Sequence, residues 1–208
     1  MIRPMAATAA VALLLAACGS PELVPPSAAP EGPVTTPPPV SAPAVDDNTL
    51  TAEGFGPLRI GMSRAEVVSA LGEDSNPGAV GGPEPEACDQ WRPARAPDGL
   101  LVMVQDGTLT RISVSEPSTL KTDRGFGVGD PATSIKAAYG SSAVAEPHKY
   151  VAAPAEDIFV WTKGGPASAG SYVEEAGARG IRYEINGEGR VNMVHVGGPA
   201  IQLVEGCS

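Results

Sequence analysis

The 208-residue sequence predicts an α+β fold made of two tandem α-β-β-β repeats, in which helices pack on an antiparallel sheet. The main observation is similarity within the chain. "LRIGMSRAEVVSALG" (58–72) aligns with "FGVGDPATSIKAAYG" (126–140) at an offset of 68 residues, and "MVQDGTLTRISV" (103–114) aligns with "EINGEGRVNMVHV" (184–196) with one inserted residue. Agreement in both order and residue type indicates a duplication. We expect the repeats to occupy residues 49–122 and 123–208.

Each repeat is predicted to start with a short helix. In the first copy, Ser63 and Glu66 have the spacing of a capping box, and Gly72 suits the left-handed residue that ends a helix. In the second copy, Asp130 is the expected N-cap and Pro131 the first helical residue. A phosphate-binding loop is the alternative, but "LRIGMSRAEV" has one glycine and no lysine, and Asp130 would oppose a phosphate.

Strands are predicted to follow each helix. "LLVMV" and "TRISV" flank Asp106-Gly107, and "IRYEI" and "RVNMVHV" flank residues 186–189, so both linkers have the composition of hairpin turns. Trp91 and Trp161 lie on the preceding strands, at an offset of 70 residues that makes them approximate counterparts.

The N-terminus is typical of an export signal, with Arg3 as its one charge and an apolar stretch that is too short to span a membrane. "LAAC" (15–18) resembles the lipobox of bacterial lipoproteins. That resemblance implies a signal peptide of residues 1–17 and acyl chains, palmitate among them, on Cys18. Gly19 is not the aspartate of inner-membrane retention, which implies an outer-membrane anchor with the body in the periplasm or at the extracellular face of the envelope. A plain secretory signal is the alternative.

Residues 18–48 are rich in proline, interleaved with Ala, Ser, Thr and Val. Proline removes backbone donors and favours the extended polyproline II conformation, so this composition does not build a packed core. We interpret the segment as a disordered stalk. At about 3 Å per residue, it would hold the body several nanometres from the membrane.

The charge of the predicted body bears on the class of partner. From Thr49 to Ser208 there are 20 acidic and 13 basic side chains, a net charge of −7, which disfavours nucleic acid as a partner.

If Cys18 is lipidated, Cys88 and Cys207 remain, and an even number of remaining cysteines in an oxidising envelope predicts a disulfide. A zinc site is the weaker alternative, because no histidine pair accompanies these cysteines.

The glycine-flanked helix motif, together with the lipobox and the stalk, resembles a superfamily of bacterial envelope proteins. It includes the SmpA/OmlA (BamE-type) outer-membrane lipoproteins and the tandem-repeat β-lactamase inhibitory proteins. The motif residues are Gly61, Met62, Ser63, Glu66, Val67, Leu71 and Gly72 in the first copy and Gly129 and Gly140 in the second. The resemblance implies helices on an antiparallel sheet; it does not extend to the loops that would identify a partner.

Strand alternation assigns the two faces of the predicted sheet. The residues expected to face the helices are Val102, Val104, Ile112, Val114, Tyr183, Ile185, Val194 and Val196. Leu101, Leu109, Ser113 and Val191 are expected on the opposite face, with six residues that form a possible binding face: Met103, Arg111, Arg182, Glu184, Met193 and His195. A solvated face, or one partly covered by loops, is the alternative.

No arrangement of residues predicts catalysis, a cofactor or a metal. "STLK" (118–121) has the S-x-x-K spacing of penicillin-recognising enzymes but lacks their partner motifs, and the two histidines, His148 and His195, lack metal-ligand spacing. Glu84, Glu86 and Asp89 could hold calcium, but the surrounding prolines favour a solvated surface segment.

We therefore expect a non-enzymatic, lipid-anchored scaffold or binding module that contacts another envelope protein or a cell-wall component. An enzyme inhibitor of the β-lactamase-inhibitory-protein or lysozyme-inhibitor type is one alternative. A small enzyme that uses Ser118 or His195 is another.

Overall fold

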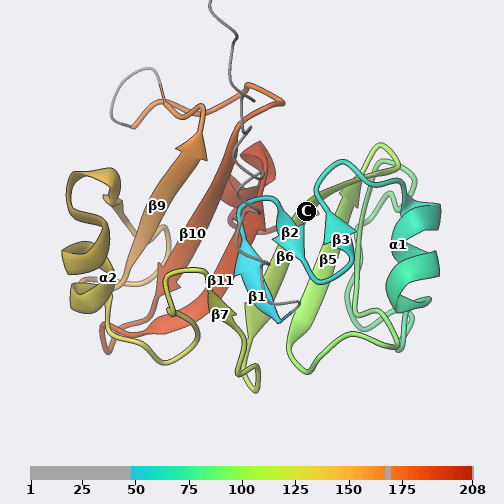
Figure 1. The fold of residues 1–208 in the computed structure, drawn as a ribbon, viewed down its shortest axis with the longest axis horizontal. Helices are drawn as coiled ribbons and strands as arrows, with labels where there is room; N and C mark the ends of the chain where they lie inside the picture. Colours follow the sequence, from blue (N-terminus) through green and yellow to red (C-terminus); the bar gives the residue numbers. More distant parts are fainter. Residues whose placement is uncertain (1–47, 167–169, 208) are drawn as a thin grey trace, which may run out of the picture. The chain divides into compact units, whose positions relative to one another are not determined.

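The computed structural model describes residues 48–166 and 170–207. The predicted α+β class is confirmed, and within the described residues sheet predominates over two short helices. The larger sheet is antiparallel and has seven strands, ordered β4-β5-β6-β11-β10-β9-β8 (Figure 1). Their bounds are β4 Cys88–Trp91, β5 Leu100–Gln105, β6 Thr108–Ser115, β8 Val144–Pro147, β9 Glu156–Lys163, β10 Arg179–Ile185 and β11 Val191–Gly197. Both predicted hairpins are present as β5–β6 and β10–β11.

A second, smaller sheet was not predicted from the sequence. It contains β1 (Thr49–Thr51), β2 (Gly54–Phe55), β3 (Leu58–Arg59) and β7 (Lys121–Thr122), and β1 pairs with β7 in parallel. Strands of two or three residues are too short to give an alternating hydrophobic signal, so periodicity could not reveal them. The small sheet contributes Leu50, Phe55 and Leu58 to the core.

The two helices, α1 (Arg64–Leu71) and α2 (Ala132–Tyr139), start differently. The predicted capping box of α1 is confirmed, because Ser63 and Glu66 bond reciprocally to each other's backbone N–H. The expected cap at Asp130 is wrong. Pro131 is the N-cap of α2 and provides no side-chain bond, while the Asp130 carboxylate accepts hydrogen bonds from the Gly127 N–H and from Lys121 Nζ, both at 2.7 Å.

Each helix start is fastened to its hairpin by the same backbone hydrogen bonds. In the N-terminal half they are Gly61 N to Leu109 O at 2.9 Å, Leu109 N to Met62 O at 2.8 Å and Arg64 N to Gly107 O at 3.0 Å. In the C-terminal half they are Gly129 N to Val191 O at 2.9 Å, Val191 N to Asp130 O at 2.9 Å and Ala132 N to Gly189 O at 3.0 Å. Gly61 and Gly129 both have positive φ angles, which glycine adopts without steric cost.

The core lies between the large sheet on one side and the helices and small sheet on the other. All eight residues expected to face the helices belong to it. Leu109 and Val191 also belong to it, so their predicted place on the opposite face is wrong. The reason is a β-bulge in each hairpin, between Met103 and Val104 and between Glu184 and Ile185, which shifts the pairing register.

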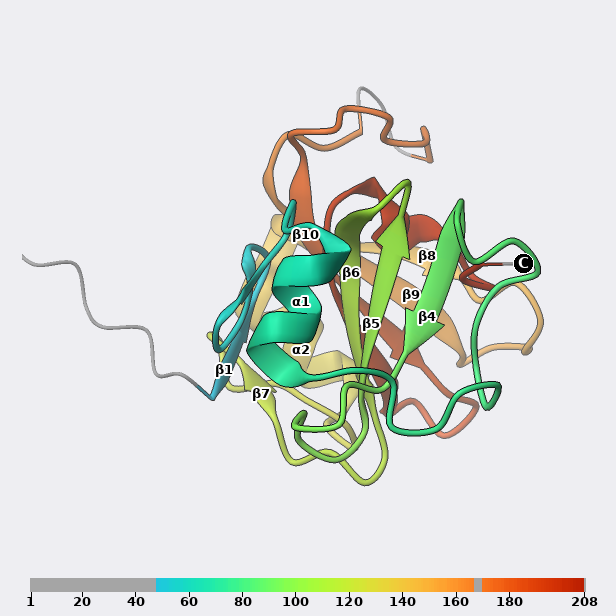
Figure 2. The same ribbon diagram turned by 90° about the vertical axis from the view of Figure 1, so that its right-hand side faces the viewer.

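The face of the large sheet that points away from the core is called the outer face below. The 3₁₀ turn η2 (Pro199–Gln202) and the chain that follows it run over this face. Figure 2 shows the small sheet and α1 on the same side of the large sheet. A second 3₁₀ turn, η1 (Gly140–Ser142), links α2 to β8.

No helix within the described residues has the length and apolar character of a membrane span. The predicted signal sequence, Cys18 and the stalk up to residue 47 lie outside the described residues.

Candidate binding site

The six residues of the possible binding face all lie on the outer face, but four of them are buried. Met103, Arg111, Arg182 and His195 are 3% exposed or less, while Glu184 and Met193 are partly exposed. The expectation that this face is open to a partner therefore fails for its centre. A face partly covered by loops was the alternative. The alternation of residues along the strands could not decide between the two, because the covering residues follow the last strand of the sheet.

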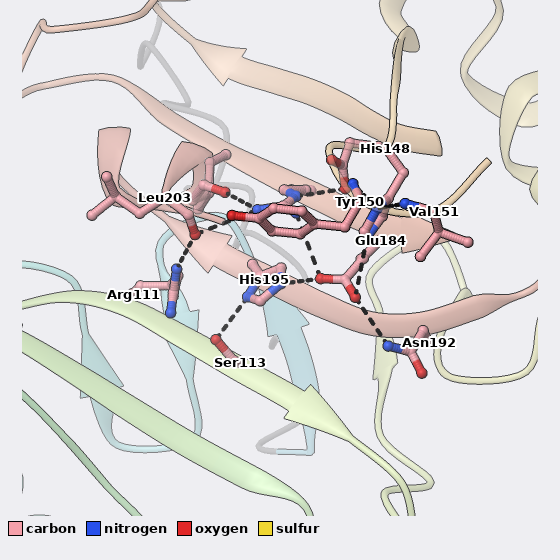
Figure 3. Close-up of polar contacts among 12 residues, drawn as sticks. Arg111, Ser113, His148, Tyr150, Val151, Glu184, Asn192, His195 and Leu203 are labelled. Atoms are coloured by element: carbon pink, nitrogen blue, oxygen red, sulfur yellow. Dashed lines mark hydrogen bonds and ion pairs between the residues drawn. The ribbon is translucent and has the colours of Figure 1, made fainter. Parts of the chain in front are cut away.

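Two arginines hold the covering segment, residues 199–207. Arg111 Nη1 donates to the carbonyl oxygen of Leu203 at 2.8 Å (Figure 3) and to that of Ala200 at 3.2 Å. Arg182 Nη1 donates to the carbonyl oxygens of Ile201 at 3.3 Å and Leu203 at 3.4 Å. Hydrogen bonds from charged donors are stronger than neutral ones. The covering segment is thus an integral part of the outer face.

The predicted pairing of Cys88 and Cys207 is present as a disulfide, with Cα atoms 5.4 Å apart and a sequence separation of 119 residues. It ties the covering segment to the edge strand β4. Met103 and Ala200 pack beside it in a small apolar cluster.

The buried charges beneath the covering segment balance one another. Arg182 Nε donates to Asp157 Oδ1 at 2.8 Å, and Arg182 Nη2 lies 3.5 Å from Glu184 Oε2. Arg111 Nη2 donates to Gln90 Oε1 at 2.9 Å, and burial beside Arg182 lowers the pKa of Arg111 to about 10, which leaves it protonated at neutral pH. Breaking such a pair leaves an uncompensated buried charge, so these contacts are structural.

Ser113, His195 and Glu184 have the residue types of a hydrolase triad. Ser113 Oγ lies 2.8 Å from His195 Nδ1, and His195 Nε2 lies 3.5 Å from Glu184 Oε2 (Figure 3). Ser113 and His195 are only 2% and 3% exposed, so a substrate cannot reach them. Burial, and secondarily the nearby Arg111 and Arg182, lowers the pKa of His195 to about 3, which makes it a very weak base at neutral pH.

Glu184 stays ionised within this network. The interaction with His195 and a hydrogen bond from Asn192 lower the pKa of the Glu184 carboxyl to about 2, against the opposing effect of burial. Ser113, His195 and Glu184 are therefore best understood as part of a buried polar network that supports the sheet, in which His195 Nε2 lies near Glu184 without a close hydrogen bond.

The S-x-x-K stretch does not form a nucleophile–base pair. The Ser118 hydroxyl accepts a hydrogen bond from the Leu120 N–H at 3.3 Å, and Lys121 Nζ donates to the Asp130 carboxylate at 2.7 Å. Of the three carboxylates considered for calcium, Asp89 instead pairs with Arg64 at 2.6 Å. No group of three metal-ligating side chains is found within the described residues.

The outer face remains open beyond the covering segment, over β8 and β9. A hollow of about 230 Å³ lies there, between these strands, residues 170–172 and the covering segment. Its lining includes Glu146, Lys149, Phe159, Trp161, Tyr172 and Gln202.

The rim of the hollow includes Tyr172, which lines it and is 56% exposed, and the loop of Lys149, another lining residue, in which Tyr150 and Val151 are 60% and 44% exposed. Tyr150, Val151 and Tyr172 are the exposed large hydrophobic side chains found within the described residues. The other two tyrosines of the chain, Tyr139 and Tyr183, bond to each other through their hydroxyl groups at 3.0 Å, and Tyr183 is fully buried. Tyrosine thus has two separate uses, in the core and around the hollow.

The walls of the hollow are held in place by specific hydrogen bonds. The Gln202 side chain accepts from the Val173 N–H at 2.9 Å and donates to the Val173 carbonyl at 3.0 Å, which fixes the segment that bears Tyr172. His148 Nδ1 accepts the backbone N–H groups of Tyr150 and Val151, both at 3.1 Å (Figure 3). Fixed walls reduce the ordering cost of binding.

The hollow and its rim were not predicted from the sequence. The signal available was the occurrence of Tyr150 and Tyr172 in segments otherwise rich in alanine, glycine, serine and proline, where no core position accounts for a large ring. Comparison of the chain with family models, with curated proteins and with solved structures finds no match.

Proposed function

We propose that the chain is a lipid-anchored, non-enzymatic binding protein of the bacterial cell envelope, and that it contacts another envelope protein through the hollow and its rim. The lipobox at residues 15–18 and the proline-rich stalk support the anchor and an outer-membrane location. Cys18 would be the lipid attachment site. No nucleic acid, metal or cofactor is part of this proposal.

We also propose that the body arose by tandem duplication, in keeping with the resemblance to BamE-type lipoproteins and β-lactamase inhibitory proteins. The matched hydrogen bonds at the two helix starts and the matched bulges of the two hairpins support it. The strand pairings favour a different match for the tryptophans, however. Trp91 pairs with Val102 and Ile158 pairs with Tyr183, so Ile158, rather than Trp161, is the counterpart of Trp91.

The observation that carries the binding function is an open hollow with exposed apolar side chains on the two loops that border it. Tyr150, Val151 and Tyr172 lie on two separate loops that both border it. Isolated exposed hydrophobic residues need no explanation, but several around one concavity mark an interaction site. Tyrosine is also enriched among residues that contribute most to binding energy.

Site-specific crosslinking tests this proposal in intact cells. A photo-crosslinking residue at position 172 is expected to give a discrete protein adduct, which disappears in a Tyr150→Ser variant. The same crosslinker at the exposed position Arg92, on the N-terminal half, is the matched control and is expected to give none. Equal adducts at both positions, or an adduct at 172 that Tyr150→Ser leaves unchanged, would contradict the proposal.

A further inference from the structure

We infer that the hollow receives a basic side chain, a guanidinium or ammonium group of the partner protein, with Glu146 as its counter-charge and Trp161 and Tyr172 as its aromatic walls. This inference rests on the proposed function and specifies the chemistry of the same site.

A row of carboxylates across three adjacent strands favours a cation in the hollow. Glu146 of β8 is paired with Asp157 of β9, which is paired with Glu184 of β10, so the three side chains share the outer face. Like charges directly opposite each other on a sheet are destabilising unless a cation compensates them.

The two inner carboxylates have their cation within the protein, since Arg182 contacts both Asp157 and Glu184. The outermost has none among the residues that the structure describes. Lys149, the cation that lines the hollow, is paired with Glu205 at 3.1 Å. Glu146 is partly exposed, and thus able to meet a cation that enters from outside.

The aromatic lining of the hollow also favours a cation. Phe159, Trp161 and Tyr172 border the same hollow as Glu146. Arginine and lysine bind the faces of aromatic rings, and binding strengthens when the site excludes water. Two lining residues already take part in such contacts: Arg182 Cζ lies 5.9 Å from the ring centre of Phe159, and Lys149 Nζ lies 4.9 Å from the ring centre of Tyr150.

Size and charge favour the same occupant. A hollow of about 230 Å³ is smaller than the usual site for a drug-sized ligand, which suits a single side chain. The chain has a net charge of −10, so a basic partner surface would be attracted to it before contact. An arginine or lysine flanked by apolar residues would fill the hollow and also cover the rim.

Fluorine NMR of the full-length chain in detergent tests the inference. The chain has two tryptophans, and labelling both with 5-fluorotryptophan gives a reporter at Trp161 and an internal reference at Trp91, which is 1% exposed. The probes are N-acetyl-arginine methylamide and its citrulline analogue, which keeps the shape and lacks the charge.

The arginine probe is expected to shift the Trp161 signal saturably and to leave the Trp91 signal unchanged, with citrulline binding about tenfold more weakly. Glu146→Gln is expected to weaken arginine binding by a similar factor of about ten. The matched control Glu188→Gln removes an exposed carboxylate from the β10–β11 turn and is expected to change nothing.

Equal binding of arginine and citrulline, an unchanged affinity in Glu146→Gln, or no shift of the Trp161 signal would each overturn the inference. These results are separable from the crosslinking result. Crosslinks at position 172 without arginine binding would leave the binding function standing and remove only the cationic anchor.

Discussion

The N-terminal half (residues 48–122) and the C-terminal half (residues 123–207) share one framework, and they differ where the hollow lies. Both have a helix fastened to a hairpin by the same three backbone hydrogen bonds. The connection that leads into the hairpin differs in length, however. Trp91 of β4 and its partner Val102 of β5 are 11 positions apart, whereas Ile158 of β9 and its partner Tyr183 of β10 are 25 positions apart. The C-terminal half also adds β8 beyond β9.

The added chain of the C-terminal half builds the hollow. The longer β9–β10 connection carries Tyr172, and the extra strand β8 carries Glu146 and leads into the loop with Tyr150. The shared parts are caps, turns and core residues. We conclude that the framework supplies stability, whereas the binding function that we propose depends on what the two halves do not share.

The substitution between the halves that we expect to affect stability most is at Leu101 and Arg182. These are corresponding positions, because Leu101 pairs with Ser113 in one hairpin and Arg182 pairs with His195 in the other. We predict that Arg182→Met lowers the free energy of unfolding by about 3 to 5 kcal/mol, because it leaves Asp157 and Glu184 without their buried cation. Urea unfolding measures this. Arg190→Met, an exposed arginine of the same half, is the control and is expected to change stability by about 0.5 kcal/mol or less.

If Arg182→Met lowers the free energy of unfolding no more than Arg190→Met does, water reaches the buried carboxylates and the centre of the outer face is open. It would also restore the sequence-based expectation of an exposed binding face there.

The next difference is between Ser113 and His195, which face each other in the β6–β11 pair. The pKa of His195 is lowered from 6.5 to about 3 in the folded protein, so the unfolded chain binds the extra proton first as pH falls. Stability from the neutral imidazole is therefore complete above pH 6.5 and declines below it. Between pH 6.5 and 5 we expect a loss of about 1 to 2 kcal/mol.

Urea unfolding at several pH values measures that slope. His195→Gln is expected to flatten it between pH 6.5 and 5, whereas Ser113→Ala is expected to keep it, because the histidine remains buried beside two arginines. An unchanged slope in His195→Gln would show that the acid sensitivity arises elsewhere.

The fold could be predicted best where a local feature, such as a helix cap or a tight turn, requires a particular residue type. Ser63 with Glu66 predicted a capping box and Asp106-Gly107 predicted a hairpin turn, and both are present. The structure adds that Asp106 and Gly107 both have positive φ angles. Alternation assigned the core face correctly except at Leu109 and Val191, where bulges change the register. A bulge depends on pairing between strands, which the alternation of one strand cannot show.

The candidate site could not be predicted from the pattern of single strands either, because it depends on contacts between distant segments. Whether Arg111 is buried or exposed depends on residues 199–207, which share no periodic pattern with the strand that they cover. The hollow is bordered by β8, β9 and two loops that are distant in sequence. Residue types could indicate a disulfide between Cys88 and Cys207, but they could not indicate which part of the sheet that disulfide would close off.

The smallest difference that we expect to measure is at the two helix starts. Ser63 accepts the Glu66 N–H at the start of α1, whereas Pro131 gives α2 no side-chain cap. We predict that Ser63→Ala lowers the free energy of unfolding by about 1 kcal/mol, the usual cost of removing a serine cap. Ser134→Ala, an exposed serine within α2, is the control and is expected to have little effect. If the two variants destabilise equally, the backbone hydrogen bonds common to both halves, such as Gly61 N to Leu109 O, fix the start of α1 without help from its cap. The two helix starts would then be equivalent in stability despite their different residues.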